Sequence, residues 1–330
     1  MRKLLVTGGM GFIGSNFILH MLSRYDDLHI TNIDALTYAG NPDNLSDIAH
    51  SDAYRFVRAD ITDAEQVGRI FAENPFDGVV HFAAESHVDR SIVHPEAFVR
   101  ANVLGTFHLL EAARRYETPK FIHVSTDEVY GTLGDTGYFT EQSPLMPNSP
   151  YSASKAGSDL LARSYAQTYG LPVIITRCSN NYGPRQFPEK LIPTIILRAL
   201  HDEPIPIYGD GTHVRDWLYV MDHCAAIDAA LRRGIAGEVY NIGGHHECTN
   251  LEVTRMVLQE LRKPESLITF VADRLGHDKR YAIDPAKTER ELGWRPGKEL
   301  EQGMKETIMW YVTNRSWWER VRSGAYLEGR

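Results

Sequence analysis

The chain has 330 residues, of which 43% are hydrophobic and 24% are charged, and 35 Lys and Arg against 43 Asp and Glu give a net charge of -8. At roughly 150 residues per domain, this length fits about two domains, each large enough to bury its own core. The acidic balance and the lack of a Lys/Arg run argue against nucleic acid as a partner, whereas a nucleotide-sized ligand is not excluded.

Cysteine usage and the N-terminus bear on the cellular compartment. Cys178, Cys224 and Cys248 form no C-x-x-C pair, and their odd number disfavours a disulfide framework. The first apolar run breaks into glycines after Val6, which makes it too short for a signal peptide. No aliphatic stretch reaches the ~20 residues of a membrane span. We therefore expect a soluble, reduced, cytoplasmic protein that does not act on a membrane.

Six short runs rich in β-branched residues alternate with helical patterns over the first half of the chain. They cover residues 3–7, 29–33, 54–57, 79–82, 121–124 and 173–176. Runs that are apolar on both faces and alternate with helices are typical of a parallel sheet covered on both sides. The fold class we expect is therefore α/β, a doubly wound parallel Rossmann sheet with a smaller C-terminal α/β lobe.

The pattern changes near residue 180, where the alternation loosens and prolines cluster. We predict a first domain over residues 1–180 and a substrate-binding lobe over 181–330, with exchange of strands and helices between them allowed, and a last helix near residues 300–312. Ligands of open α/β sheets bind beyond the carboxyl ends of the strands, so a cleft between the lobes is the expected site.

A glycine turn follows the first predicted strand, with Gly8, Gly11 and Gly14 spaced G-x-x-G-x-x-G. Such glycines allow a pyrophosphate to approach the N-terminus of the next helix, where free N–H groups favour anions. Asp34 ends the second strand, 20 residues after Gly14, where a carboxylate can bind an adenosine ribose and repel a 2′-phosphate. The pattern favours NAD over NADP. The competing interpretation is a plain turn with a capping aspartate.

Two further segments carry groups suited to catalysis. Tyr151 and Lys155 lie four residues apart at the start of a predicted helix, where nearby positive charge could lower the phenol pKa enough to make it a base. Thr126, Asp127 and Glu128 follow the fifth predicted strand, and the two carboxylates could divide acid and base roles. The alternatives are a surface Tyr–Lys pair and a helix N-cap with acids that complement the dipole.

Together these motifs resemble the extended short-chain dehydrogenase/reductase family, and most closely its members that dehydrate dTDP-glucose. The resemblance spans nearly the whole chain and includes the segments 180–184, 188–193, 214–220, 276–281 and 317–318. The adjacent Asp127 and Glu128 are its specific feature, because related 4-epimerases lack both acids and related decarboxylases and GDP-mannose dehydratases usually have a Ser-Glu pair.

The resemblance implies a role for each matching position. The catalytic residues would be Thr126, Asp127, Glu128, Tyr151 and Lys155. The residues that bind NAD would be Gly8, Gly11, Phe12, Ile13, Gly14, Asp34, Ala35, Leu36, Thr37, Asp60, Ile61, Phe82, Ala83, Ala84, Ser86, Ala101, Tyr151, Lys155, Cys178 and Asn181. The residues that bind the nucleotide sugar would be Ser86, Thr126, Asn180, Lys190, Leu191, Pro206, Ile207, Tyr208, Arg215, Asn250, Asp273, Arg274 and His277.

The implied reaction uses NAD only transiently. Tyr151 would remove the C4 hydroxyl proton as hydride leaves C4, Glu128 would take the C5 proton, and Asp127 would protonate the departing C6 hydroxyl before hydride returns to C6. For Asp127 to act as an acid near pH 7, its pKa must rise by about 3 units through burial and the neighbouring carboxylate.

Other interpretations remain open. A UDP-glucose dehydratase, another nucleotide-sugar epimerase or decarboxylase, or an NAD-binding regulator without activity are the rival functions. The resemblance also implies a homodimer paired through helices near 95–115 and 153–169. Leu275 stands where the family usually has proline, and Ala101 where threonine is common. The tract His245, His246, Glu247 and Cys248 offers metal-ligand types without a partner cluster, so no metal is expected.

Overall fold

The computed structural model describes residues 1–327. Its largest sheet has seven parallel strands in the order β10-β6-β5-β4-β1-β2-β3. These strands are β1 (Lys3–Thr7), β2 (His29–Asp34), β3 (Tyr54–Arg58), β4 (Gly78–His81), β5 (Phe121–Thr126), β6 (Val173–Cys178) and β10 (Val239–Ile242). The first six coincide with the six predicted runs, and their order is that of a Rossmann sheet extended by one strand.

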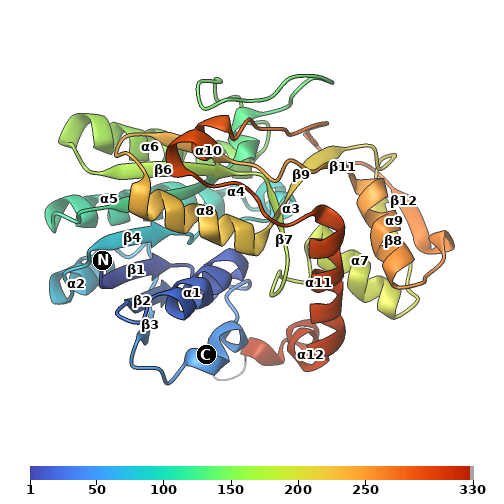
Figure 1. Ribbon diagram of the computed structural model, residues 1–330, viewed down its shortest axis with the longest axis horizontal. Coiled ribbons are helices and arrows are strands. Elements are labelled where there is room, and N and C mark those ends of the chain that lie inside the picture. Colours follow the sequence, from blue (N-terminus) through green and yellow to red (C-terminus); the bar gives the residue numbers. More distant parts are fainter. Residues whose placement is uncertain (328–330) are drawn as a thin grey trace.

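Helices cover both faces of this sheet, as the left half of Figure 1 shows. The helices α1 (Phe12–Arg24) and α8 (Val220–Arg233) pack together over one face, and α2 (Ala64–Glu73), α5 (Thr106–Arg115) and α6 (Pro150–Tyr169) cover the other. Both faces of the strands are buried in apolar cores. The doubly wound α/β class is therefore confirmed, because only burial on both faces explains strands without polar alternation.

A second lobe lies at the right of Figure 1 and contains two small sheets. One joins β11 (Glu247–Thr249), β9 (Val214–Tyr219) and β7 (Asn180–Tyr182), and the other joins β12 (Ile268–Val271) and β8 (Ile205–Tyr208). The helices α7 (Leu191–Leu200), α9 (Asn250–Glu260) and α11 (Leu300–Thr313) pack around a separate apolar core.

The predicted helix near residues 300–312 is present as α11, but it is not the last helix. The helix α12 (Arg315–Ser323) follows after Asn314 and buries Trp317 and Trp318. These two aromatic side chains supply the packing that stabilises a short helix of otherwise polar composition. The two tryptophans stood out in the sequence, but no helix was predicted for them.

The chain crosses between the two parts more than once. After β7 enters the small sheet, α8 returns to pack on α1, and β10 joins the edge of the large sheet beside β6. The large sheet is thus completed by residues beyond position 180. As a result, β6 and β7, joined through Ser179, lie where the two lobes meet.

The remaining helical segments are short. They are η1 (Pro42–Ile48), α3 (Val88–Val93), α4 (Pro95–Phe98), the π-helical η2 (Val99–Gly105), η3 (Asp127–Tyr130), η4 (Glu265–Leu267), α10 (Ala286–Leu292) and η5 (Ala325–Leu327). Within residues 1–327, no helix has both the length and the apolar character needed to cross a bilayer.

Candidate active site

A cavity of about 520 Å³ lies at the carboxyl ends of the large-sheet strands. Its wall includes the turn after β1, the end of β2 and the loops after β3 and β4, together with Tyr151 and Lys155 on α6. Every residue predicted to bind the cofactor lies in this wall except Leu36. Leu36 is buried behind the wall with φ 55°, and its side chain packs in the apolar core.

The glycine turn leaves no room for side chains. Gly8 has φ +70°, and a Cβ there would lie 2.6 Å from the backbone nitrogen of Ala83. At Gly14 a Cβ would lie 2.4 Å from the carbonyl oxygen of Gly8. Because the backbone itself forms the surface at the start of α1, an anion can approach its N–H groups closely. This cradle fits the pyrophosphate of a dinucleotide.

Asp34, the last residue of β2, is held in place by backbone N–H groups. Its Oδ2 accepts a hydrogen bond from the Met10 N–H at 3.0 Å, and its Oδ1 accepts one from the Leu36 N–H at 2.8 Å. The carboxylate therefore has a fixed orientation in the cavity wall, as ribose recognition requires. Phe12, Ile13, Asp60 and Ile61 are in the same wall.

The start of α6 brings Tyr151 and Lys155 to the sheet. Ser149 caps the helix in a reciprocal capping box with Ser152, which fixes the first turn against β5. Tyr151 and Lys155 are both buried in the cavity wall, and the Lys155 Nζ donates to the Val124 carbonyl at 2.9 Å. The pair is thus part of the site, which argues against the surface-pair alternative.

The pKa of Tyr151 differs from the sequence expectation. Burial raises the pKa of this phenol well above its usual range, and the carboxylate of Glu128 raises it further, whereas a hydrogen bond with Thr126 lowers it. Lys155 does not offset these effects within the protein alone. Positive charge from a bound oxidised nicotinamide is consequently needed before the phenol becomes a base near neutral pH.

The adjacent acids lie in the turn that follows β5. Burial raises the pKa of Asp127 well above its usual range, and the neighbouring Glu128 and Asp216 raise it further. Its Oδ2 is buried without a hydrogen-bond partner, which suits a protonated carboxyl. This is the direction expected for an acid. Thr126 does cap the turn by accepting from the Glu128 N–H at 3.3 Å, so the capping interpretation holds alongside the catalytic one.

Glu128 has a different environment from Asp127. Burial raises its pKa as well, but the cations Arg215, Lys190 and Arg274 all favour its ionised form. Glu128 lines both this cavity and the adjoining one, whereas Asp127 is 1% exposed and lies in neither wall. The surroundings therefore favour the protonated form of Asp127 more than that of Glu128, for which three cations favour the ionised form.

A second cavity of about 350 Å³ adjoins the first and extends between the lobes. The two cavities share wall residues from both lobes, namely Ser86, Glu128, Asn180, Asn181, Gln186, Glu189 and Lys190. Of the predicted substrate-binding residues, all but Thr126, Ile207 and Asp273 line this second cavity, and Thr126 lines the first. Ile207 is 1% exposed and packs in the core of the second lobe, because alternate residues of β8 face opposite sides.

Two buried cations face the second cavity. The guanidinium of Arg215 donates to the carbonyl oxygens of Val214 and Asp278 at 2.8 and 2.9 Å and lies over the Tyr281 ring. Lys190 donates to the Ser86 carbonyl at 2.8 Å, and burial lowers its pKa. Because these hydrogen bonds go to carbonyls rather than to carboxylates, both charges remain suited to an anionic ligand.

An ion pair joins the lobes across the second cavity. Arg274, in the loop after β12, forms a two-pronged pair with Asp89 of α3 at 2.5 and 2.9 Å. The Tyr208 hydroxyl also donates to Asp89 at 3.4 Å. Sequence reasoning gave Arg274 a ligand role but did not foresee this carboxylate partner, since Asp89 and Arg274 are far apart in the chain.

Several wall residues were not predicted from the sequence. Gln186 and Glu189 line both cavities, and Asp89 and Tyr281 line the second. Glu189 and Tyr281 lie inside segments that the resemblance had singled out, and Gln186 lies between two of them, which was the available signal; Asp89 had none. The π-helical η2, which presents Arg100 and Ala101 to the first cavity, has no comparable signature in the sequence. Leu275, the other departure from the family pattern, is 76% exposed.

A doubly wound sheet with a glycine cradle, a fixed ribose-binding acid and a buried Tyr–Lys pair defines an NAD-dependent enzyme of the extended short-chain dehydrogenase/reductase type. Residues 5–307 match the family model described as GDP-mannose 4,6 dehydratase. The chain therefore belongs to this family of nucleotide-sugar enzymes.

Within the family, the chain is similar to proteins named dTDP-glucose 4,6-dehydratase. It is 51% identical to the one from Neisseria meningitidis serogroup B, over 99% of this chain and 98% of the relative, and 53% identical to one from Xanthomonas campestris pv. campestris, over 99% and 97%. The solved structure of DesIV, a dTDP-glucose 4,6-dehydratase from Streptomyces venezuelae with NAD and TYD bound, matches with a TM-score of 0.94 and 51% identity, covering 97% of this chain and 99% of DesIV.

A related activity is represented at lower similarity. The UDP-glucose 4-epimerase of Thermus thermophilus, solved in complex with NAD, matches with a TM-score of 0.88 and 33% identity over 94% of this chain and 99% of the epimerase. The fold and the NAD complex are thus common to proteins with either activity.

Proposed function

We propose that this protein is a hydro-lyase that converts dTDP-glucose to dTDP-4-keto-6-deoxy-glucose in deoxysugar biosynthesis, with tightly held NAD. The observation that carries the proposal is the pair of acids after β5: Glu128 lines both cavities where they meet, Asp127 is buried next to it, and their pKa values are set by different surroundings. An epimerase needs no acid to expel the C6 hydroxyl. Similarity to dTDP-glucose 4,6-dehydratases over almost the entire chain supports the same activity.

The first cavity fits NAD. Gly8, Gly11 and Gly14 would hold the pyrophosphate, and Asp34 would hold the adenosine ribose. When bound, NAD+ would supply a hydride acceptor for C4 of the sugar and, once reduced, the hydride donor for C6. We assign this binding to residues 1–180, together with the strand and helix that return to the large sheet, and the nucleotide sugar to residues 181–330.

The protein's own groups move the protons. Tyr151, oriented by Thr126 and neighboured by Lys155, takes the C4 hydroxyl proton. The C4 ketone acidifies the C5 hydrogen, which Glu128 removes as the ionised carboxylate. Asp127, kept protonated by burial, gives its proton to the C6 hydroxyl, which leaves as water. Glu128 then returns its proton to C5. Tyr151 has by then gained a proton and Asp127 has lost one, so transfer of a proton from Tyr151 to Asp127, with the Thr126 hydroxyl between them, restores the starting protonation state.

The diphosphate of the substrate is negatively charged and needs local cations. Arg215 and Lys190 meet this need, because their hydrogen bonds go to carbonyl oxygens rather than to carboxylates. Pro206, Tyr208, Asn250 and His277, which line the second cavity, would enclose the nucleoside.

The deciding experiment is incubation of the purified protein with dTDP-glucose and, separately, UDP-glucose, without added NAD. We expect a 4-keto-6-deoxy product, detected by its absorbance in alkali, from dTDP-glucose and less from UDP-glucose. Galactose-type product without alkaline absorbance would contradict the dehydratase in favour of an epimerase, and preference for UDP-glucose would correct the nucleotide.

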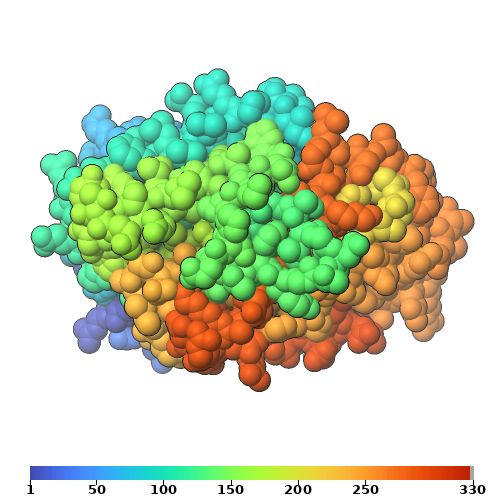
Figure 2. Space-filling view, turned by 90° about the horizontal axis from the view of Figure 1, so that it is seen from above, coloured from blue at the N-terminus to red at the C-terminus, as the bar shows by residue number. Residues whose placement is uncertain are grey.

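The same reasoning extends to assembly and compartment. We infer a homodimer formed through α5 and α6, which lie side by side on the face seen in Figure 2 in teal and yellow-green. Val99, Leu104, Phe107 and Leu160 are exposed apolar side chains on or next to these helices. The three free cysteines suit the cytoplasm. A monomer by light scattering at micromolar concentration would contradict the dimer.

A further inference from the structure

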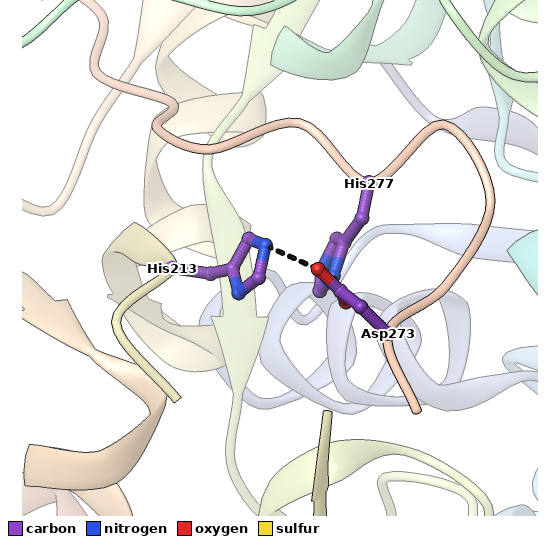
Figure 3. A group of neighbouring side chains, drawn as sticks. All are labelled: His213, Asp273 and His277. Atoms are coloured by element: carbon purple, nitrogen blue, oxygen red, sulfur yellow. Dashed lines mark hydrogen bonds and ion pairs between the residues drawn. The ribbon is translucent and has the colours of Figure 1, made fainter. Parts of the chain in front are cut away.

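One side-chain cluster beside the second cavity includes His277, which would enclose the nucleoside, and two residues that have no role in the function described so far. It consists of His213, in the turn before β9, and Asp273 and His277, in the loop after β12 (Figure 3). His277 Nδ1 lies 2.7 Å from Asp273 Oδ1, and His213 Nε2 lies 3.3 Å from Asp273 Oδ2. The two imidazole rings are stacked, with centroids 3.7 Å apart and planes at 16°. The Asp273 carboxylate therefore contacts both of the stacked imidazole rings.

We propose that His213 is a positioning residue for nucleotide binding: its ring and the shared carboxylate hold His277 in one tautomer and one orientation in the wall of the second cavity. Asp273 accepts the Nδ1–H of His277, so Nε2 at the opposite edge of that ring carries a lone pair. His277 thus presents a hydrogen-bond acceptor to the cavity. The complementary ligand group is a donor on a nucleoside, such as a ribose hydroxyl or a base imide N–H. This inference rests on the proposed function.

Stacking on His213 restricts rotation of the His277 ring, which the hydrogen bond to Asp273 alone does not prevent. His213 is buried, with 4% of its surface exposed; its backbone carbonyl accepts from the Asn250 N–H at the start of α9, and its ring Nε2 pairs with Asp273, so the ring is confined beside His277. Offset or parallel stacking of such rings fixes the plane of a partner, whereas a single hydrogen bond leaves rotation about itself free. Two contacts of different kinds are needed to define the direction of Nε2.

The surrounding charges favour neutral rings. Burial and the cations Arg215 and Arg274 lower the pKa of His277 to about 4, although Asp273 acts in the opposite direction. Burial lowers the pKa of His213 as well, with Arg215 and Lys279 adding to the effect and Asp273 and Asp210 opposing it. Near pH 7 both rings are therefore neutral and Asp273, whose pKa is lowered chiefly by its bond to His277, is ionised.

The same residue types also bind transition metals, but their geometry favours hydrogen bonding. Imidazole lone pairs lie in the ring plane, so two rings stacked nearly parallel direct them side by side rather than toward one ion at ~2.0–2.1 Å. The other histidine tract does not add a ligand, because His245 contacts Glu289 and His246 contacts the Lys298 carbonyl. A metal ion is thus the competing explanation that the experiment has to separate.

The test compares two replacements of His213. His213→Phe retains a ring for stacking and removes the Nε2–H, and His213→Gln retains a donor for Asp273 and removes the ring. We expect each to raise the KM for dTDP-glucose and the Kd for dTDP by about 5- to 10-fold, with kcat within twofold, because each removes one of the two contacts. The matched control is His50→Gln, the same replacement at an exposed histidine that lies in neither cavity wall, and this variant should keep both constants.

A spectroscopic measurement separates positioning from a general structural role. In the wild type, the imidazole ¹⁵N shifts of His277 should report a proton on Nδ1 and none on Nε2, and the variants should show mixed tautomers. Unchanged KM and Kd in both variants, or a fall in kcat alone, would overturn the proposal. So would a rise in KM after EDTA treatment of the wild type, since that would show a metal ion.

The outcome is distinguishable from failure of the proposed function. If the wild type binds dTDP but turns over no dTDP-glucose, the proposed function fails while the dTDP Kd values still test His213. If the wild type binds no nucleotide, both fail. If it turns over dTDP-glucose and the His213 variants match it, only this inference fails.

Discussion

The two adjoining cavities are built in different ways. The wall of the first includes glycines without room for a Cβ, and the aspartate Asp34, whose carboxylate is fixed by backbone N–H groups at most 24 residues away in the chain. The wall of the second includes charged side chains from distant segments, such as Lys190, Arg215 and the pair of Asp89 with Arg274. A cofactor that stays bound can use a fixed backbone surface, whereas a substrate that enters and leaves needs charges that can exchange partners.

The largest effect is expected at Asp127, which is buried next to Glu128 where the two cavities meet. Asp127→Asn removes the proposed acid but keeps the size of the side chain, and it should slow formation of the 4-keto-6-deoxy product by about 10³-fold. Oxidation at C4 should be nearly unaffected, because Tyr151, Thr126 and Lys155 are unchanged. Rapid-quench analysis would measure both steps, with the reduced nicotinamide absorbance rising and persisting in the variant.

Two outcomes would refute this division of labour. Equal loss of C4 oxidation and elimination would mean that Asp127 supports the whole site rather than one step. Normal elimination would assign the acid to Glu128. Asp202→Asn, which alters an exposed carboxylate on the second lobe, is the control and should retain wild-type rates.

The next variant should disrupt only the first cavity, where NAD would bind. Gly8→Ala places a Cβ 2.6 Å from the Ala83 nitrogen at a residue with φ +70°, so the turn must shift. We expect the purified variant to lose its NAD and to retain about 1% of the activity, since a displacement of 1 Å at a binding site can cost ~100-fold. Its affinity for dTDP should remain within about threefold of wild type.

Gly68→Ala is the matched control for Gly8→Ala. It lies inside α2, and a Cβ there meets nothing within 4 Å. It should retain both NAD and activity and gain slightly in stability, because Ala has the higher helix propensity. If Gly8→Ala still carries stoichiometric NAD by absorbance of the denatured protein, the backbone cradle is not the pyrophosphate site.

A third variant should weaken ligand binding only in the second cavity. Arg215→Met removes a buried guanidinium while keeping an apolar chain of similar length, and the KM for dTDP-glucose should rise about 10- to 30-fold, as for loss of a charged hydrogen bond. The NAD content should be that of the wild type. Arg255→Met, at an exposed position on α9, is the control. Loss of NAD from Arg215→Met would contradict the separation of the two cavities.

The two cavities also differ in how far the sequence could predict them. Gly8, Gly14 and Asp34 lie within one strand-turn-helix-strand unit, so their spacing alone specifies their geometry. The Asp89–Arg274 pair is separated by 185 residues, and no local pattern indicates that these side chains meet. Resemblance to a family supplied most of the second wall, but it assigned Ile207 and Asp273 to a cavity whose wall they do not line. Which face of β8 is buried depends on packing against α7 and α9, which only the folded chain defines.

The smallest expected effect concerns stability at the junction. A carboxyl whose pKa is raised in the folded state binds more protons there than in the unfolded chain, so it destabilises the fold increasingly as pH rises above 3.8, its unfolded value. Asp127→Asn removes this cost without removing the Thr126 contact, because the amide oxygen can still accept from the Oγ1. Near pH 3.5 the Tm of variant and wild type should agree, and at pH 8 the variant should melt about 2–4 °C higher, measured by calorimetry. A variant that is equally or less stable at pH 8 would mean that Asp127 is ionised and compensated in the fold, and the proton for the C6 hydroxyl would then need another source.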